Sequence, residues 1–304
     1  MDRTELQERL RGISAVMITP FDESGAVDLD GVEATADFLV RGGMKTIVPL
    51  GNTGEFYGLT EVEARAVVEA TVAAVAGRAA VVVGVGLSPA EAGNAAEHAH
   101  EAGADAVMVH QPANPYTTGS GLCAYYDAVS QRSSLPIVPY VKTPALRLDD
   151  LVTVATLPAV VGIKYAVNDL PLFASAVERT RGSGVVWVCG TAETWAPFFF
   201  AGGAEGFTSG LVNVTTGPSL ALLEALRQGD RERALGIWAG IRPFEELRAL
   251  HGDGFNVSVV KEAVRQLGRA AGGVRPPASA VGAEERREIA DLLAAWELSP
   301  LTAV

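Results

Sequence analysis

The chain has 304 residues, of which 48% are hydrophobic, and a formal net charge of −12 at pH 7. This length fits one barrel domain of about 250 residues with an appendage, and the acidic balance disfavours nucleic acid or an anionic membrane surface as a partner. The charged N-terminus, the lack of an apolar stretch of about 18 residues and the two cysteines without metal or disulfide spacing predict a cytoplasmic protein.

Short β-branched runs recur along the chain and predict eight strands. They span residues 13–19, 46–50, 80–85, 106–110, 136–140, 160–164, 185–189 and 206–209. Segments with helical spacing lie between them, at residues 32–40, 61–75, 89–102, 121–130 and 170–179. Because apolar strands alternate with helices, we expect an α/β fold in which a parallel sheet closes into a (β/α)8 TIM barrel over residues 1–217. An open doubly wound sheet is the alternative, but the sequence has no Gly-x-Gly-x-x-Gly turn after the first strand.

The strand pattern stops at Pro218, and helical patterns follow it. They cover residues 219–228, 231–250, 256–271 and 284–296. We therefore expect residues 218–304 to form a helical extension packed on the barrel, with assembly as one interpretation of its role.

Only four lysines occur among the 24 basic residues, and Lys164 stands out by its position. It ends the predicted strand over residues 160–164, and reactive groups of such barrels gather at the carboxyl ends of the strands. Apolar surroundings lower the pKa of an amine and make it the nucleophile that a Schiff base requires. The alternative is an ammonium that extends into solvent. Lys45 at a strand start and Lys261 in a tail helix have ordinary explanations, whereas Lys142 lies close enough to the barrel mouth to touch a substrate.

Tyr140 ends the fifth predicted strand, one strand and helix unit before Lys164. The two side chains should therefore emerge on neighbouring strands at the same rim of the barrel. A phenol beside a carbinolamine can transfer protons as water is lost, so Tyr140 is a candidate general acid and base. The alternative is a tyrosine that covers the core with its hydroxyl in water.

A glycine-containing turn follows the second predicted strand. Its residues are Gly51, Asn52, Thr53 and Gly54, with Glu55 next. Such a turn can direct several backbone N–H groups to one point, and the Thr53 hydroxyl adds another donor, so we expect a carboxylate-binding site. Glu55 is interpreted as a brace of this loop rather than a base.

Further polar groups follow the last two strands. Gly190, Thr208, Ser209 and Asn213 are predicted to offer amides and hydroxyls to a polyhydroxylated substrate. Helix capping explains Asn213 equally well.

The histidines predict no metal site, because they are scattered and lack carboxylate partners at ligand spacing. A metal-dependent barrel lyase is therefore disfavoured, and no cofactor is expected. His110 ends the fourth strand and could enter the mouth as a polar neighbour.

Three features occur in one chain: the loop over residues 51–55, Tyr140 after an apolar strand, and Lys164 after Gly162-Ile163. Together they resemble the dihydrodipicolinate synthase / N-acetylneuraminate lyase family of class I aldolases. The resemblance implies a (β/α)8 barrel with a C-terminal helical extension, in a homo-oligomer that is usually a tetramer, with a dimer as the other possibility. It also implies that Lys164 forms an imine with pyruvate or another small 2-keto acid, that Tyr140 transfers protons, and that Thr53 binds the carboxylate.

The sequence departs from the dihydrodipicolinate synthases at three places. Ala113 and Asn114 occupy the positions of a tyrosine pair that these enzymes share. Asn52 replaces the first threonine of their carboxylate-binding loop. Ala145 stands in place of an arginine that binds the second substrate, although Arg147 lies near.

Other features resemble the 5-dehydro-4-deoxyglucarate dehydratase branch: residues 54–56, 191–193 and 208–209, with Asn213 following. We therefore expect a hydro-lyase acting on a 2-keto acid, with or without loss of carbon dioxide. A pyruvate-dependent aldolase and a dihydrodipicolinate synthase-like condensation share the same imine and stay open. A non-catalytic barrel that binds a keto acid is the alternative of another class.

Overall fold

Eight parallel strands form a closed barrel in the computed structural model, which describes residues 1–299. Each strand pairs with the next one along the chain, and β8 pairs with β1. The strands are β1 (Ile13–Val16), β2 (Thr46–Val48), β3 (Ala80–Val85), β4 (Ala106–His110), β5 (Ile137–Val141), β6 (Gly162–Tyr165), β7 (Val186–Cys189) and β8 (Gly206–Ser209). The predicted (β/α)8 fold is confirmed.

The first two strands are shorter than predicted, and local bonding explains both ends. The backbone N–H of Ile18 donates to the side chain of Asn213 rather than to a neighbouring strand, so β1 ends at Val16. Leu50 has a φ of 57°, a left-handed conformation that a strand cannot contain, and β2 ends before it at Val48.

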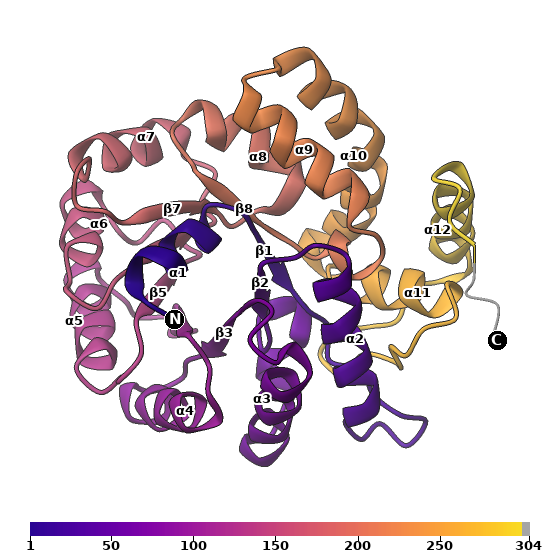
Figure 1. The fold of residues 1–304 in the computed structure, drawn as a ribbon, viewed down its shortest axis with the longest axis horizontal. Coiled ribbons are helices and arrows are strands. Elements are labelled where there is room, and N and C mark those ends of the chain that lie inside the picture. The colour runs from indigo at the N-terminus through magenta and orange to yellow at the C-terminus, as the bar shows by residue number, and fades with distance from the viewer. Residues whose placement is uncertain (300–304) are drawn as a thin grey trace.

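Helices surround the barrel, as seen down its axis in Figure 1. They are α2 (Leu29–Arg41), α3 (Glu61–Val75), α4 (Pro89–Ala102), α5 (Gly119–Ser130), α6 (Leu148–Ala155), α7 (Leu170–Arg179), α8 (Ala192–Ala201) and α9 (Gly217–Gln228). Helices α3, α4 and α7 have the predicted bounds. Two of these starts have a local cause, since capping boxes at Thr60 and Ser88 satisfy the first backbone N–H groups of α3 and α4.

Helix α1 (Arg3–Leu10) lies across the amino-terminal end of the barrel (Figure 1). Its Leu6 and Leu10 are buried at 1% and 2% exposure and join the cluster of apolar side chains inside the barrel. That cluster includes Val16, Val48, Val82, Met108, Val138 and Val188. Because side chains fill this end, polar chemistry is confined to the opposite rim.

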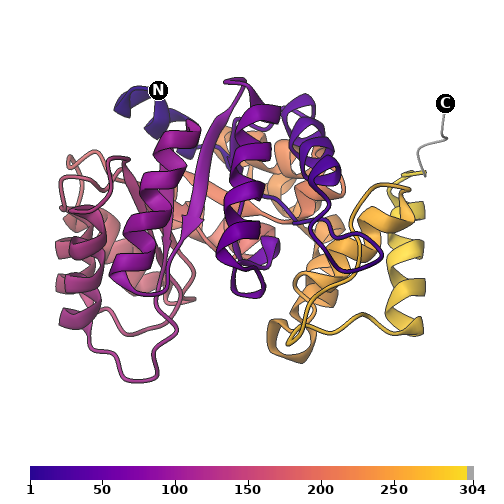
Figure 2. The same ribbon diagram turned by 90° about the horizontal axis from the view of Figure 1, so that it is seen from below.

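The chain continues after β8 and α9 with α10 (Arg231–Asp253), α11 (Ser258–Gln266) and α12 (Ala283–Ala295). Helices α11 and α12 stand beside the barrel in Figure 2. Non-helical backbone at Leu250, His251 and Gly252 interrupts α10 near the predicted end at residue 250. Helix α11 is shorter than the predicted 256–271. The division into residues 1–217 and 218–304 stays a prediction, and residues 300–304 lie outside the described residues.

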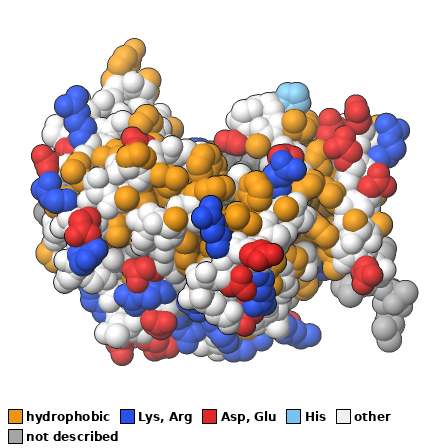
Figure 3. Space-filling model, turned by 90° about the horizontal axis from the view of Figure 1, so that it is seen from above, with side chains coloured by type: hydrophobic (Ala, Val, Ile, Leu, Met, Phe, Trp, Pro, Cys, Tyr) orange, Lys and Arg blue, Asp and Glu red, His pale blue; other side chains and the backbone are white. Residues whose placement is uncertain are grey.

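Acidic and basic side chains lie close to one another around hydrophobic ones on the face shown in Figure 3. Among the helices of the described residues, none combines the length and the hydrophobicity that crossing a bilayer requires.

Candidate active site

Tyr140 and Lys164 are paired residues of the adjacent strands β5 and β6. The Lys164 Nζ lies 3.9 Å from the centroid of the Tyr140 ring. Both residues are buried, each at 5% exposure, and both line the same cavity. The strand ends therefore bring an amine and a phenol together.

The Lys164 ammonium has lost most of its hydration. Leu10, Val48 and Val138 contribute to the apolar layer beneath it. Burial, with a smaller contribution from the positive charge of Lys142, lowers the pKa of Lys164 from 10.5 to about 7. A large fraction of Lys164 is thus an uncharged nucleophile near neutral pH.

The Tyr140 hydroxyl accepts a hydrogen bond from the side-chain N–H of Asn52, with 3.3 Å between Nδ2 and Oη. Burial holds the pKa of Tyr140 well above its usual 10, so the phenol stays protonated at neutral pH. Because its oxygen accepts from Asn52, the hydroxyl hydrogen remains available to a group in the cavity.

The loop after β2 contains two 3-10 turns, η1 (Asn52–Gly54) and η2 (Phe56–Gly58). The backbone N–H groups of Gly54 and Glu55 donate to carbonyls within the loop. Among residues 1–299, those of Asn52 and Thr53 donate to no other protein atom. Both residues line the cavity, so their N–H groups and the Thr53 hydroxyl form a site suited to a carboxylate.

Gly51 and Gly54 allow the backbone of this loop to pack closely against neighbouring residues. A Cβ at Gly51 would lie 2.3 Å from Cγ1 of Val16, and one at Gly54 would lie 3.0 Å from the carbonyl oxygen of Met17. Neither glycine lines the cavity. We assign both to the shape of the loop, and their direct contact with a substrate stays a prediction.

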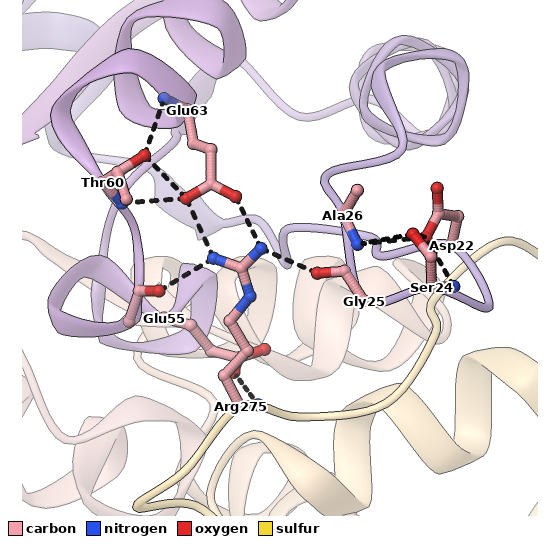
Figure 4. Close-up of polar contacts among 9 residues, drawn as sticks. Asp22, Ser24, Gly25, Ala26, Glu55, Thr60, Glu63 and Arg275 are labelled. Atoms are coloured by element: carbon pink, nitrogen blue, oxygen red, sulfur yellow. Dashed lines mark hydrogen bonds and ion pairs between the residues drawn. The ribbon is translucent and has the colours of Figure 1, made fainter.

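Glu55 connects this loop to the tail of the chain. Its carboxylate lies 2.6 Å from the Lys261 ammonium and accepts the backbone N–H of Arg275 at 2.8 Å. The Arg275 guanidinium in turn binds the Glu63 carboxylate of α3, as Figure 4 shows. It also donates to the Gly58 carbonyl. These contacts agree with the predicted bracing role of Glu55. They give Lys261 a specific partner that its place in a tail helix did not indicate.

The cavity at the carboxyl rim of the barrel has a volume of about 500 Å³. Six of the predicted site residues line it: Asn52, Thr53, Tyr140, Lys164, Gly190 and Thr208. Lys142 lines it as well, whereas Arg147 caps the start of α6 and does not.

Ser209 and Asn213 do not reach this cavity. The Ser209 hydroxyl donates to the buried Glu193 carboxylate behind the barrel wall. The Asn213 side chain, in the turn η3 (Leu211–Asn213), accepts from the Ile18 N–H at 3.0 Å and donates to the Val16 carbonyl at 2.9 Å. This corrects the expectation that these two side chains face a substrate.

His110 has a supporting position beneath the loop. Its Nε2 donates to the Leu50 carbonyl at 2.9 Å, and its ring stacks on Phe56 with 4.2 Å between centroids. Burial lowers the pKa of His110 to about 3, so the imidazole is neutral. His110 does not line the cavity, and its hydrogen bond holds Leu50, the left-handed residue that follows β2.

The tail adds charged residues to the cavity wall that the sequence did not indicate. Arg248 of α10 binds the Glu245 carboxylate at 2.7 Å and the Asn256 side-chain oxygen at 3.0 Å. Asp253 and Arg275 also line the cavity. No local pattern marks them, because their place depends on how the tail packs on the barrel. In the part of the chain that the structure describes, no group of three or more His, Cys, Asp or Glu side chains could hold a metal ion.

The chain is similar to known proteins over most of its length. A family model described as the dihydrodipicolinate synthetase family matches residues 9–296. A probable 5-dehydro-4-deoxyglucarate dehydratase 2 of Streptomyces avermitilis is 32% identical, over 93% of this chain and 86% of its own. A 4-hydroxy-tetrahydrodipicolinate synthase of Methanoculleus marisnigri is 34% identical, over 88% and 92%. The crystal structure of a dihydrodipicolinate synthase from Bacillus clausii has a TM-score of 0.94 and 43% identity, covering 96% of this chain and all of that one.

Proposed function

The chain belongs to the dihydrodipicolinate synthetase family and is a Schiff-base-forming enzyme, and from that premise we propose that it dehydrates a 2-keto sugar acid similar to 5-dehydro-4-deoxyglucarate. The observation that carries the proposal is the buried Lys164 amine, 3.9 Å from the centre of the Tyr140 ring in one cavity. We assign Lys164 as the imine-forming residue and Tyr140 as the proton-transfer residue.

The first step forms the imine. The substrate carboxylate binds the N–H groups of Asn52 and Thr53, which places the neighbouring keto carbon at Lys164. The neutral Nζ adds to this carbon, and the resulting carbinolamine loses water as the Tyr140 hydroxyl donates its proton to the departing oxygen. The product is an iminium on Lys164 and a phenolate on Tyr140.

The second step uses the iminium as an electron sink. The carbon next to the iminium loses a proton to the Tyr140 phenolate, and the electron pair forms an enamine. The enamine electrons then expel the hydroxyl group on the following carbon, which leaves as water with the proton that Tyr140 returns. Hydrolysis of the unsaturated imine releases the product and regenerates Lys164.

Sequence departures favour dehydration over condensation with a second substrate. Ala145 replaces the arginine that the synthases carry, and Ala113 and Asn114 replace their tyrosine pair. The likeness to the Bacillus clausii enzyme, at 43% identity, favours the synthase reaction as the second candidate. The third candidate is an aldolase, which would cleave a carbon–carbon bond of the substrate from the same imine.

The test begins with the imine and then separates the reactions. Borohydride reduction in the presence of pyruvate, followed by peptide mass spectrometry, should give an adduct on Lys164. Its absence would contradict the mechanism, and binding without turnover would indicate a non-catalytic barrel. Turnover is then compared for 5-dehydro-4-deoxyglucarate, 2-keto-3-deoxygluconate, N-acetylneuraminate, and pyruvate with aspartate semialdehyde. Fastest turnover of 5-dehydro-4-deoxyglucarate supports the dehydratase reaction. Fastest turnover of pyruvate with aspartate semialdehyde supports the synthase reaction.

We also propose that the enzyme is a homo-oligomer, a tetramer or a dimer, with the extension as a candidate assembly surface. Light scattering of the purified protein tests this, and a monomeric mass at catalytic concentration would contradict it.

A further inference from the structure

The cations in the cavity wall differ in what they bind. The Arg248 guanidinium is paired with Glu245 at 2.7 Å, and the Arg275 guanidinium is paired with Glu63 at 2.6 Å. Lys142 forms no ion pair with any carboxylate of residues 1–299. Its side chain is exposed rather than buried in the wall. Apart from the imine-forming Lys164, Lys142 is therefore the cation of this cavity lining that no carboxylate of residues 1–299 pairs with, and it is available to an incoming anion.

The backbone of Lys142 is fixed although its ammonium is free. Its N–H and that of Thr143 both donate to the side-chain oxygen of Gln111, at 2.8 and 3.1 Å. Lys142 follows the last residue of β5 and stands two residues after Tyr140. Its charge also acts on the amine of Lys164, because it contributes to the lowered pKa of that residue. The backbone that carries the free ammonium is thus fixed two residues after Tyr140, at the same rim as Lys164.

We propose that Lys142 binds a second carboxylate of the substrate, so that the cavity selects 2-keto acids that are anionic at both ends. The inference rests on the proposed function, in which the first carboxylate occupies the loop after β2 and the keto carbon lies at Lys164. The second carboxylate then reaches the end of β5, where a charge-assisted hydrogen bond to an ammonium is stronger than a neutral one.

The cavity wall also carries a carboxylate that forms no ion pair within residues 1–299. Asp253 lines the cavity from the end of α10 and has no ion-pair partner among the described residues. An anionic group near Asp253 is repelled, whereas one near Lys142 is attracted. The volume of about 500 Å³ leaves room for a substrate longer than pyruvate.

The test measures imine trapping rather than turnover, with two acids of equal length. 2-Oxoadipate carries a carboxylate at each end, and 2-oxohexanoate has a methyl group in place of the second one. The concentration that gives half-maximal borohydride trapping on Lys164 is determined for both. The variants are Lys142→Gln, which removes the charge, and Lys142→Arg, which keeps it. Lys45→Gln removes a charge at the opposite end of the barrel and is the matched control.

We expect 2-oxoadipate to be trapped by the unmodified enzyme at a concentration about tenfold lower than 2-oxohexanoate. Lys142→Gln should reduce this preference to within about twofold, while Lys142→Arg and Lys45→Gln keep it. An unchanged preference in Lys142→Gln, or no preference in the unmodified enzyme, would overturn the inference while pyruvate trapping still supports the proposed function. Loss of pyruvate trapping on Lys164 in the unmodified enzyme would instead overturn the proposed function itself.

Discussion

The ammonium of Lys164 lies over the face of the Tyr140 ring, 3.9 Å from its centroid. A ring face attracts a cation, which alone would favour the charged amine. Burial acts in the opposite direction and dominates, because the pKa of Lys164 falls to about 7. The ring therefore positions the amine without keeping it charged.

The rate of imine formation should follow the uncharged fraction of Lys164. We expect pyruvate trapping to rise with pH, by about tenfold per unit below pH 7, and to level off above it, since only the neutral amine is a nucleophile. Stopped-time borohydride trapping between pH 5 and 10 measures this profile. Lys142→Gln should shift the midpoint upward because it removes a positive charge near Lys164. A midpoint near pH 10.5, the ordinary pKa of a lysine, in the unmodified enzyme would contradict a lowered pKa of Lys164.

Lys164→Met should abolish trapping and stabilise the fold. The unfolded chain hydrates the ammonium, so the folded state loses roughly 2–4 kcal/mol below pH 7 by burying it. This loss shrinks as the pH rises from about 7 toward 10.5, where the amine is neutral in both states. Urea unfolding at pH 6 and pH 10 should show a larger gain at pH 6. A variant that is less stable at both values would contradict the expectation.

The buried ion pair between Glu55 and Lys261 gives a third prediction. Lys261→Met leaves the Glu55 carboxylate buried without its cation and should cost about 3–5 kcal/mol of unfolding free energy. The double variant Glu55→Gln with Lys261→Met removes both charges and should recover part of that loss. Denaturant unfolding of the single and double variants measures the difference. Equal stability of Lys261→Met and the unmodified protein would show that Glu55 does not need this partner.

Asn52 should influence catalysis through Tyr140. Asn52→Ala removes the donor that orients the phenol and should lower kcat roughly tenfold, with a smaller effect on KM. Asn52→Thr retains a hydroxyl that can donate and should keep more of the activity. Steady-state kinetics on the substrate with the fastest turnover compares the two. A loss of equal size in both variants would assign the effect to the shape of the loop instead.

The positions of Lys164 and Tyr140 could be predicted because parallel strands of a barrel end at one rim. Ser209 could have been excluded on similar grounds. It follows Thr208 on β8, and successive side chains of a strand face opposite sides, so only one of them can face the cavity. The position of the Asn213 side chain could not be predicted in this way, because its hydrogen bonds join it to Val16 and Ile18, near the other end of the chain.

The tail residues of the site could not be predicted for a different reason. Arg248, Asp253 and Arg275 reach the cavity only because α10 and the segment after α11 fold back over the barrel rim. Helical periodicity predicts that such helices exist, but it does not specify the angle at which they pack. The free charge of Lys142 is likewise visible only when the partners of the other cations are known.

The contacts of Glu55 with Lys261 and Arg275 couple the local unfolding of the loop after β2 to that of the tail. A keto acid that binds the N–H groups of Asn52 and Thr53 stabilises the folded loop on which the tail rests, and so it lowers the population of molecules in which this region is locally unfolded. Amide hydrogen exchange over residues 261–275 should therefore slow when the pyruvate adduct is formed, although these residues lie far from Lys164 in sequence. The same coupling implies that a protease cutting the tail is hindered by substrate.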